Sequence, residues 1–359
     1  MPDSAAALAQ TRHAAASSLA PTESSAHAAF AAARAAFAAA AAGRVREHHF
    51  VVGDTRVAVR CAGRALEPVI VPALTHLSAP PCTPEFTVLA WDSASTGVDL
   101  PALRPERRDD PGDGRVEIVY QRAFEMLTVI DHDAATALMW VPDARAVASN
   151  EIAAPLRVAL HLWSQRRDAR VVHGAAVGSA AGGVLIAGRS GIGKSTAALS
   201  CLAAGFGFLG DDYVLVKRAP TATVASLYCS AKLNLDQLHR FPELHARLLN
   251  PERIRDEKPV YLLGELPATR RYATLPLGAI VVPRVTGGTT RVVSASPAAI
   301  LTALAPSTMF QLPHCGAESL RWFAALAGAV PGYTLELGPN LEDIPLAVTE
   351  ALARSEMPR

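Results

Sequence analysis

The 359-residue sequence lacks the features that mark secreted, membrane-bound or nucleic-acid-binding proteins. It has only five cysteines, an odd number, and no Cys-x-x-Cys pair, which argues against a disulfide framework or a zinc site and favours a reducing compartment. The formal net charge is only +1, so charge gives no reason to expect nucleic acid or an anionic membrane as a partner. The N-terminus has no basic segment followed by an apolar core, so we predict a cytoplasmic protein without a secretory signal.

The sequence also lacks an apolar run of membrane-spanning length. The most uniform stretch, residues 27–43, is rich in alanine and carries Arg34 in its middle. Alanine favours the helix but is too weakly apolar to require a bilayer, so we predict a helix in water. Residues 1–26 before it are small, polar and low in complexity, which predicts a flexible leader.

Half of the residues are hydrophobic, which is enough to bury a sizeable core, and their pattern changes along the chain. Residues 44–148 contain short apolar runs around turns, including "HHFVVGDTRVAVRCAG" and "FEMLTVIDHDAATALMWVPD", each typical of a hairpin. A charged loop rich in proline and glycine is predicted at residues 101–114. We therefore expect a small β-rich N-terminal domain without a chemical motif of its own.

From residue 149 to residue 359 the predicted strands alternate with helices. Leu156, Leu160 and Trp163 recur at helical spacing and predict one helix over residues 150–168, which leads into this second domain. The fold class predicted for the whole chain is α/β: a P-loop core with a mixed sheet and flanking helices, preceded by the smaller β-rich domain.

Residues 188–195 read Gly-Arg-Ser-Gly-Ile-Gly-Lys-Ser and match the phosphate-binding (Walker A) pattern G-x-x-x-x-G-K-S/T. An apolar strand precedes this loop and a helix-forming run follows it, so the loop glycines can turn several N–H groups towards one phosphate group. We expect Lys194 to reach the β- and γ-phosphates of a nucleotide and Ser195 to bind Mg²⁺. The residues predicted to hold the nucleotide are Gly188, Arg189, Ser190, Gly191, Ile192, Gly193, Lys194, Ser195 and Thr196.

Two adjacent acids, Asp211 and Asp212, follow the loop after one predicted helix and one predicted strand. That path brings them back beside the loop, where one carboxylate can hold Mg²⁺ and the other can accept a proton from a hydroxyl nucleophile. A solvated Gly-Asp-Asp turn is the alternative. His173 lies at the end of a predicted hairpin, near the strand end that carries the loop, and its spacing is compatible with either an active-site or a structural role.

The segment "HGAAVGSAAGGVLIAGRSGIGKSTAALSCLAAGFGFLGDDYVLV" resembles the catalytic core of the HPr kinase/phosphorylase family. These are bacterial serine kinases whose P-loop domain is similar to phosphoenolpyruvate carboxykinase. The resemblance implies ATP as the phosphate donor and Asp211 as the acid/base on the acceptor hydroxyl. It also implies that Ser195 and Asp212 hold Mg²⁺, and that His173 lines the site near the transferred phosphate. The residues "DEKPV" around Lys258 resemble those around a lysine of related proteins, which adds Lys258 to the predicted nucleotide site.

Three departures from the family pattern bear on the acceptor. Thr196 stands where the family commonly has glutamate, the glycine-rich signature linked to phosphorylase activity is not evident, and the N-terminal region is β-rich. These departures favour a divergent HPr-kinase-like protein, a group that includes kinases of lasso-peptide biosynthesis, over a kinase of HPr itself.

The function predicted from the sequence is an ATP-dependent serine kinase that acts on a protein or peptide. Three alternatives stay open: a kinase of free serine or another small hydroxyl compound, a nucleotide-binding regulator without transfer activity, and a phosphorylase. The expected partners are the serine-bearing substrate and, because bacterial members of the family are hexameric, further copies of the chain. The weaker candidates for site residues are Lys232, Arg270, Arg271, Gln311 and His314.

Overall fold

The computed structural model describes residues 23–100, 109–110, 114–264 and 270–355. Residues 1–22 of the predicted leader lie outside these ranges. Almost all of the predicted charged loop at residues 101–114 also lies outside them. No helix within the described ranges is long and apolar enough to cross a bilayer. All five cysteines are free thiols.

The N-terminal part of the chain forms a seven-stranded mixed sheet with the order β1-β2-β3-β7-β6-β5-β4. Both predicted hairpins are present, β1 with β2 and β6 with β7. The strands are β1 (Val45–Val52), β2 (Thr55–Ala62), β3 (Phe86–Asp92), β4 (Asp109–Asp110), β5 (Val116–Gln121), β6 (Met126–Asp131) and β7 (Thr136–Val141). Short helical turns connect them: α2 (Glu67–Ile70), η1 (Pro72–Leu77), α3 (Ser93–Thr96) and η2 (Ala144–Ala146).

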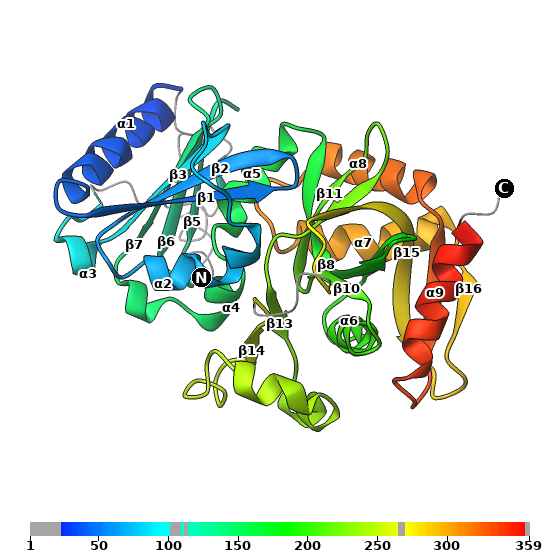
Figure 1. Ribbon diagram of the computed structural model, residues 1–359. Helices are drawn as coiled ribbons and strands as arrows, with labels where there is room; N and C mark the ends of the chain where they lie inside the picture. Colours follow the sequence, from blue (N-terminus) through cyan, green and yellow to red (C-terminus); the bar gives the residue numbers. More distant parts are fainter. Residues whose placement is uncertain (1–22, 101–108, 111–113, 265–269, 356–359) are drawn as a thin grey trace, which may run out of the picture.

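The alanine-rich helix α1 (Glu23–Ala40) lies across one face of this sheet (Figure 1). It begins and ends a few residues earlier than predicted. Phe30 and Phe37 are buried in one cluster with Trp91 and Trp140 of the sheet. The small alanine side chains let the helix approach the sheet closely, while the two phenylalanines supply most of the large apolar surface that is buried.

The prediction of a single helix over residues 150–168 is wrong, because the structure has two helices there, α4 (Ser149–Ala153) and α5 (Arg157–Gln165). Pro155 has no amide hydrogen for a helical hydrogen bond, and its ring disfavours the helical conformation of the residue before it. Leu156 then adopts a left-handed conformation with φ of 58°, and the chain turns before α5 begins.

The second sheet follows the order β10-β8-β11-β12-β15-β17-β16, and β9 pairs with both β8 and β15. The strands predicted around the phosphate loop are all formed, with the β8–β9 turn between Ser179 and Gly182. Strand β16 and the last helix were not predicted. The strands are β8 (Ala169–Ser179), β9 (Gly182–Ala187), β10 (Gly207–Gly210), β11 (Tyr213–Lys217), β12 (Thr223–Ala225), β15 (Thr274–Val285), β16 (Arg291–Ser294) and β17 (Gly332–Leu337).

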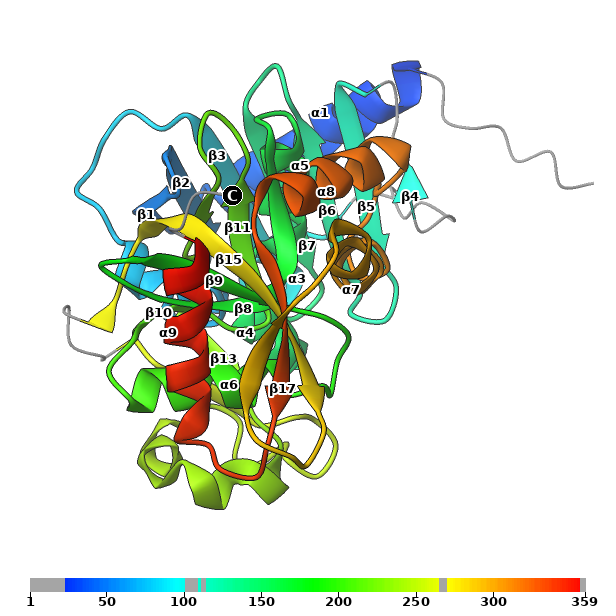
Figure 2. The ribbon, with the colours of Figure 1, turned by 90° about the vertical axis from the view of Figure 1, so that its right-hand side faces the viewer.

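Helices cover both faces of this second sheet (Figures 1 and 2). Helices α6 (Lys194–Ala203) and α9 (Asp343–Ser355) pack on one face, and α7 (Pro297–Met309) and α8 (Ala317–Ala329) pack on the other. The mixed α/β fold predicted from the sequence is therefore confirmed, with the β-rich sheet preceding it. A small two-stranded sheet of β13 (Ser230–Lys232) and β14 (Val260–Leu262) lies to the left of α6 in Figure 1. The turns η3 (Leu235–Arg240) and η4 (Pro242–Arg247) lie between its two strands in the sequence.

One apolar cluster spans the two large sheets. The ring of Trp163 on α5 stacks on Phe86 of the first sheet, with centroids 4.5 Å apart, and the same cluster includes Leu215 and Tyr228 of the second part. The proposed domain boundary before residue 149 falls between the two sheets, but apolar contacts are continuous across it.

Candidate active site

The phosphate loop connects the end of β9 to the start of α6. Gly188 and Gly191 have φ values of 129° and 86°, which other residues rarely adopt. A Cβ atom at Gly188 would also collide with the side chain of Ile192. Glycine is therefore required where the loop curls, and the curl presents backbone N–H groups at the N-terminus of a ten-residue helix.

Lys194, in the first turn of α6, is folded back over the loop. Its Nζ atom donates to the carbonyl oxygens of Gly188 at 2.8 Å and Arg189 at 3.1 Å. The side chain is almost fully buried, and this burial lowers the pKa of the amine. A phosphate group would provide the anionic partner that the buried ammonium lacks in these two neutral contacts.

Asp211, at the end of β10, is buried directly beside the loop. Its carboxylate accepts hydrogen bonds from Ser195 Oγ at 3.0 Å and from the backbone N–H of Lys232 at 2.9 Å. Burial raises the pKa of Asp211 despite these two hydrogen bonds. A buried carboxylate with a raised pKa is suited to a nearby cation or a transferred proton.

Asp212 has the opposite electrostatic setting. It sits in a left-handed turn with φ of 72°, its Oδ2 atom lies 2.5 Å from Lys232 Nζ, and its Oδ1 atom lies 3.3 Å from His173 Nε2. Burial opposes ionisation, but the charge of Lys232 and the hydrogen bonds from both partners outweigh it, so the pKa of Asp212 is well below its usual range. Asp212 therefore stays anionic at neutral pH.

The oxygen atoms of Ser195, Asp211 and Asp212 fit Mg²⁺, which prefers oxygen ligands and commonly takes only one or two carboxylates from the protein. Within the described residues, no group of three or more His, Cys, Asp or Glu side chains is arranged to hold a metal. A cation here would complete its coordination with phosphate oxygens and water, which is the usual arrangement of Mg²⁺ in kinases.

His173 is held from the far side by helix α7. Its Nδ1 atom lies 2.5 Å from Ser307 Oγ and 3.0 Å from Gln311 Nε2. Since the ionised Asp212 only accepts, the contact between His173 Nε2 and Asp212 Oδ1 places a proton on Nε2. Ser307 also reaches the loop, because its hydroxyl is 3.0 Å from the carbonyl oxygen of Gly188.

Sequence analysis missed Ser307 and assigned no role to Gln311. Both lie on or just after α7, more than a hundred residues beyond the loop, and no local pattern marks them. The register of β8 with β11, which pairs His173 with Tyr213, brings the ring to this place. Tyr213 in turn donates from its hydroxyl to Gln311 Oε1 at 2.6 Å.

The phosphate loop, the two aspartates and His173 line a cavity of about 500 Å³. Its lining combines charged side chains with the apolar side chains of Val285, Leu337, Leu341 and Ile344. The predicted residues that line it are His173, Ser190, Gly191, Gly193, Lys194, Ser195, Thr196, Asp211, Asp212, Lys232 and Lys258.

Gly188, Arg189 and Ile192 do not line this cavity and contribute through the shape of the loop. Other weak candidates lie elsewhere: Arg270 and Arg271 donate to backbone carbonyls of Leu202 and Gly264. His314 contacts Glu117 of the first sheet, 2.5 Å away.

A smaller cavity of about 290 Å³ adjoins the first on the other side of Asp212. It shares His173, Ser190, Asp212, Lys232 and Lys258 with the larger cavity, and Asn150, Arg157, Tyr213 and Gln311 complete it. Asp212 therefore borders both cavities, whereas Asp211 borders only the larger one.

Comparison with known proteins finds a family match over the segment that carries most of these residues. Residues 165–235 match the family model of the HPr Serine kinase C-terminal domain. The solved structure of the HPr(Ser) kinase/phosphatase from Coxiella burnetii is similar at 13% sequence identity and a TM-score of 0.30, over 52% of this chain and 88% of that chain. No curated protein matches the sequence. The resemblance seen in the sequence is confirmed over the matched segment.

Proposed function

We propose that this chain, which carries the HPr Serine kinase C-terminal domain at residues 165–235, is an ATP-dependent serine kinase that acts on a protein or peptide. One observation carries the proposal: Ser195 of the phosphate loop is hydrogen-bonded at 3.0 Å to Asp211, the first residue of the aspartate pair. Phosphoryl transfer needs positioning, charge neutralisation and a base for the incoming hydroxyl, and these residues supply all three within one strand–helix–strand unit.

On the donor side, the loop N–H groups and Lys194 bind the phosphates. Lys194 exchanges its two carbonyl partners for phosphate oxygens, which are stronger acceptors for an ammonium group. Ser195 and one of the two aspartates would hold Mg²⁺, which would neutralise charge on the phosphates. Lys258, at the border of both cavities, adds positive charge beside them.

On the acceptor side, Asp211 takes the proton of the serine hydroxyl. Its raised pKa makes it the stronger base of the pair, whereas the lowered pKa of Asp212 suits a metal ligand that stays anionic. Two contacts favour the reverse assignment: Ser195 bonds Asp211, and Asp212 borders the smaller cavity. We adopt Asp211 as the base, because proton transfer depends on basicity. Asparagine variants of the two aspartates separate the two roles.

The test is phosphoproteomics of cells that produce either the unaltered chain or the Lys194→Ala variant at equal levels. We expect phosphoserine sites that depend on Lys194, because loss of the ammonium removes both nucleotide binding and charge stabilisation. Purified protein with γ-labelled ATP then has to transfer label to the substrates so identified. ATP binding without Lys194-dependent phosphoserine would support a nucleotide-binding regulator and overturn the proposal.

The smaller cavity also favours a second candidate, a kinase of free serine or another small hydroxyl compound. Its volume of about 290 Å³ accommodates a single amino acid, or one side chain of a longer peptide. Comparing label transfer to free serine and to serine-containing peptides separates the two candidates. Transfer to free serine at the higher kcat/KM would assign the chain to the second.

A further inference from the structure

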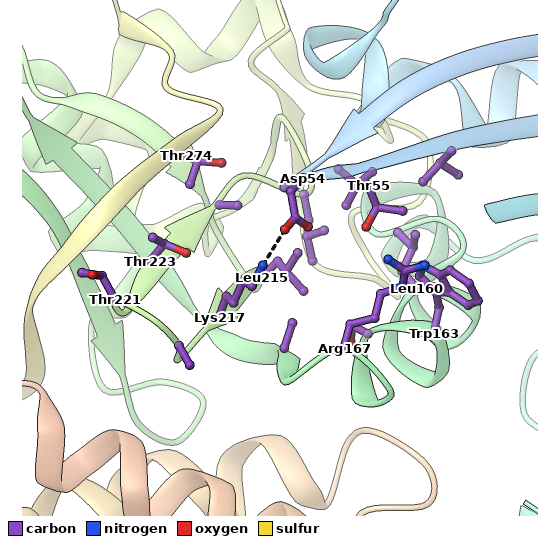
Figure 3. Close-up of a pocket in the computed structure, with 18 of the residues that line it drawn as sticks. Asp54, Thr55, Leu160, Trp163, Arg167, Leu215, Lys217, Thr221, Thr223 and Thr274 are labelled. Carbon is purple, nitrogen blue, oxygen red and sulfur yellow. Dashed lines mark hydrogen bonds and ion pairs between the residues drawn. The ribbon is translucent and has the colours of Figure 1, made fainter. Parts of the chain in front are cut away.

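A second cavity, apart from the candidate active site, lies at the junction of the two sheets (Figure 3). Its volume of about 440 Å³ is in the range of small-molecule binding sites. It is enclosed by the β1–β2 hairpin tip, α5, β11 and β12. None of its lining residues belongs to the phosphate loop or to the aspartate pair.

The inner wall of this junction cavity is apolar. Leu160, Trp163, Leu215, Ala225 and Leu227 all line it, and all are buried side chains of the core. A ligand that filled the cavity would therefore place an aliphatic or aromatic body against these groups.

Two hydrogen-bond donors belong to side chains that line the cavity, Trp163 and Arg167. Trp163 is 8% exposed, and its indole Nε1 is buried without a partner among the residues that the structure describes. The guanidinium of Arg167 lies 4.3 Å from the centroid of the Trp163 ring. Its closest carboxylate within the described ranges is that of Glu85, at 3.9 Å, beyond hydrogen-bond distance. The indole N–H is buried away from solvent, whereas the Arg167 side chain is 40% exposed, so a ligand in the cavity can bring an acceptor oxygen to the guanidinium.

The charges of the lining indicate what kind of acceptor fits. Lys217 and Asp54 form an ion pair of 2.5 Å at the cavity, which leaves Arg167 as the cation without a close partner there (Figure 3). Figure 3 also shows Thr221, Thr223 and Thr274 across the cavity from Trp163 and Arg167. Arginine binds a carboxylate through two parallel N–H groups, which a neutral oxygen cannot match.

We propose that the junction cavity is a binding site for a small amphipathic carboxylate. Its apolar body packs against Leu160, Leu215 and Leu227, and its carboxylate accepts from the Arg167 guanidinium. This site is independent of the proposed kinase activity, and binding alone tests it.

The experiment is isothermal titration of the full chain with three probes: 4-phenylbutyrate, its neutral amide 4-phenylbutanamide, and acetate. We expect 4-phenylbutyrate to bind in the sub-millimolar range and the amide to bind about tenfold more weakly, since a charged hydrogen bond is lost. Acetate, which lacks the apolar body, should not bind measurably at millimolar concentration.

Variants locate the bound probe. Thr223→Phe and, independently, Ala225→Leu fill the cavity and should abolish binding, with circular dichroism showing that each variant is folded. Arg167→Gln should weaken the binding of 4-phenylbutyrate about tenfold and leave the binding of the amide unchanged. Arg218→Gln is the matched control, because Arg218 pairs with Asp168 outside the cavity lining. Absence of binding to the unaltered chain, or binding that survives in folded filling variants, would refute the proposal.

Discussion

The Nζ atom of Lys232 lies 2.5 Å from Oδ2 of Asp212, while the backbone N–H of the same lysine donates to Asp211. One residue of β13 therefore contacts both aspartates of the candidate site. Its charge is the main reason that the pKa of Asp212 stays low against the effect of burial. The small sheet of β13 and β14 is thus part of the site's electrostatics.

Replacing Lys232 by methionine should shift the pH dependence of phosphate transfer. Without the ammonium group the pKa of Asp212 rises, so Asp212 becomes protonated at a higher pH as the solution is acidified. The acid limb of the kcat/KM profile should move to higher pH. Lys258→Met is the control, since Lys258 borders the same cavity without pairing with Asp212. This variant should weaken ATP binding and leave the acid limb of the profile at the same pH.

Paired asparagine variants should separate the roles of the two aspartates. Asp211→Asn should lower kcat by about 10²–10⁴ with ATP affinity retained, because a general base contributes a factor of that order. Asp212→Asn should weaken Mg²⁺ binding, so that the rate requires a higher Mg²⁺ concentration and excess Mg²⁺ restores part of it. If excess Mg²⁺ instead rescues only Asp211→Asn, the two roles are exchanged. Full activity of Asp211→Asn would remove Asp211 from the mechanism.

Removing Arg157 should destabilise the fold strongly. Arg157 Nη2 lies 2.7 Å from Glu151 Oε1, and both side chains are buried. Arg157→Met leaves the Glu151 carboxylate buried and unpaired, which costs about 3–5 kcal/mol. Urea denaturation measures the change, and Arg145→Met, which breaks an exposed pair with Asp143, should leave the midpoint unchanged. Equal midpoints for both variants would contradict this account.

Glu117 should make the stability of the protein sensitive to acid. Burial opposes its ionisation, but hydrogen bonds from His132 and His314 lower its pKa to about 2 from an ordinary value of 4.5. Because the folded-state pKa is the lower one, this stabilisation is complete above about pH 4.5 and is lost as the pH falls towards 2.

The Glu117→Gln variant tests this dependence. It should reduce the free energy of unfolding at neutral pH by an amount on the order of 2–3 kcal/mol, and the difference from the unaltered chain should shrink on acidification. A difference that stays constant with pH would show that Glu117 acts through packing alone.

Much of the site could be predicted because it is local in the chain. The glycine spacing specifies the curl of the loop, and the apolar runs on each side specify the strand and helix that flank it. Asp211 and Asp212 return to the loop because one short helix and one strand have few ways to pack. The break at Pro155 was missed because the helical spacing of leucine and tryptophan continues through it.

The amino-acid sequence by itself determined the phosphate loop, the position of the aspartates beside it and the mixed α/β class, since these follow from backbone conformation and short-range periodicity. Only the tertiary structure decided which groups surround the aspartates. Ser307, Gln311 and Lys232 arrive from distant elements, and the junction cavity exists only where the two sheets meet. Such contacts depend on how whole layers pack, and no single segment of the chain encodes them.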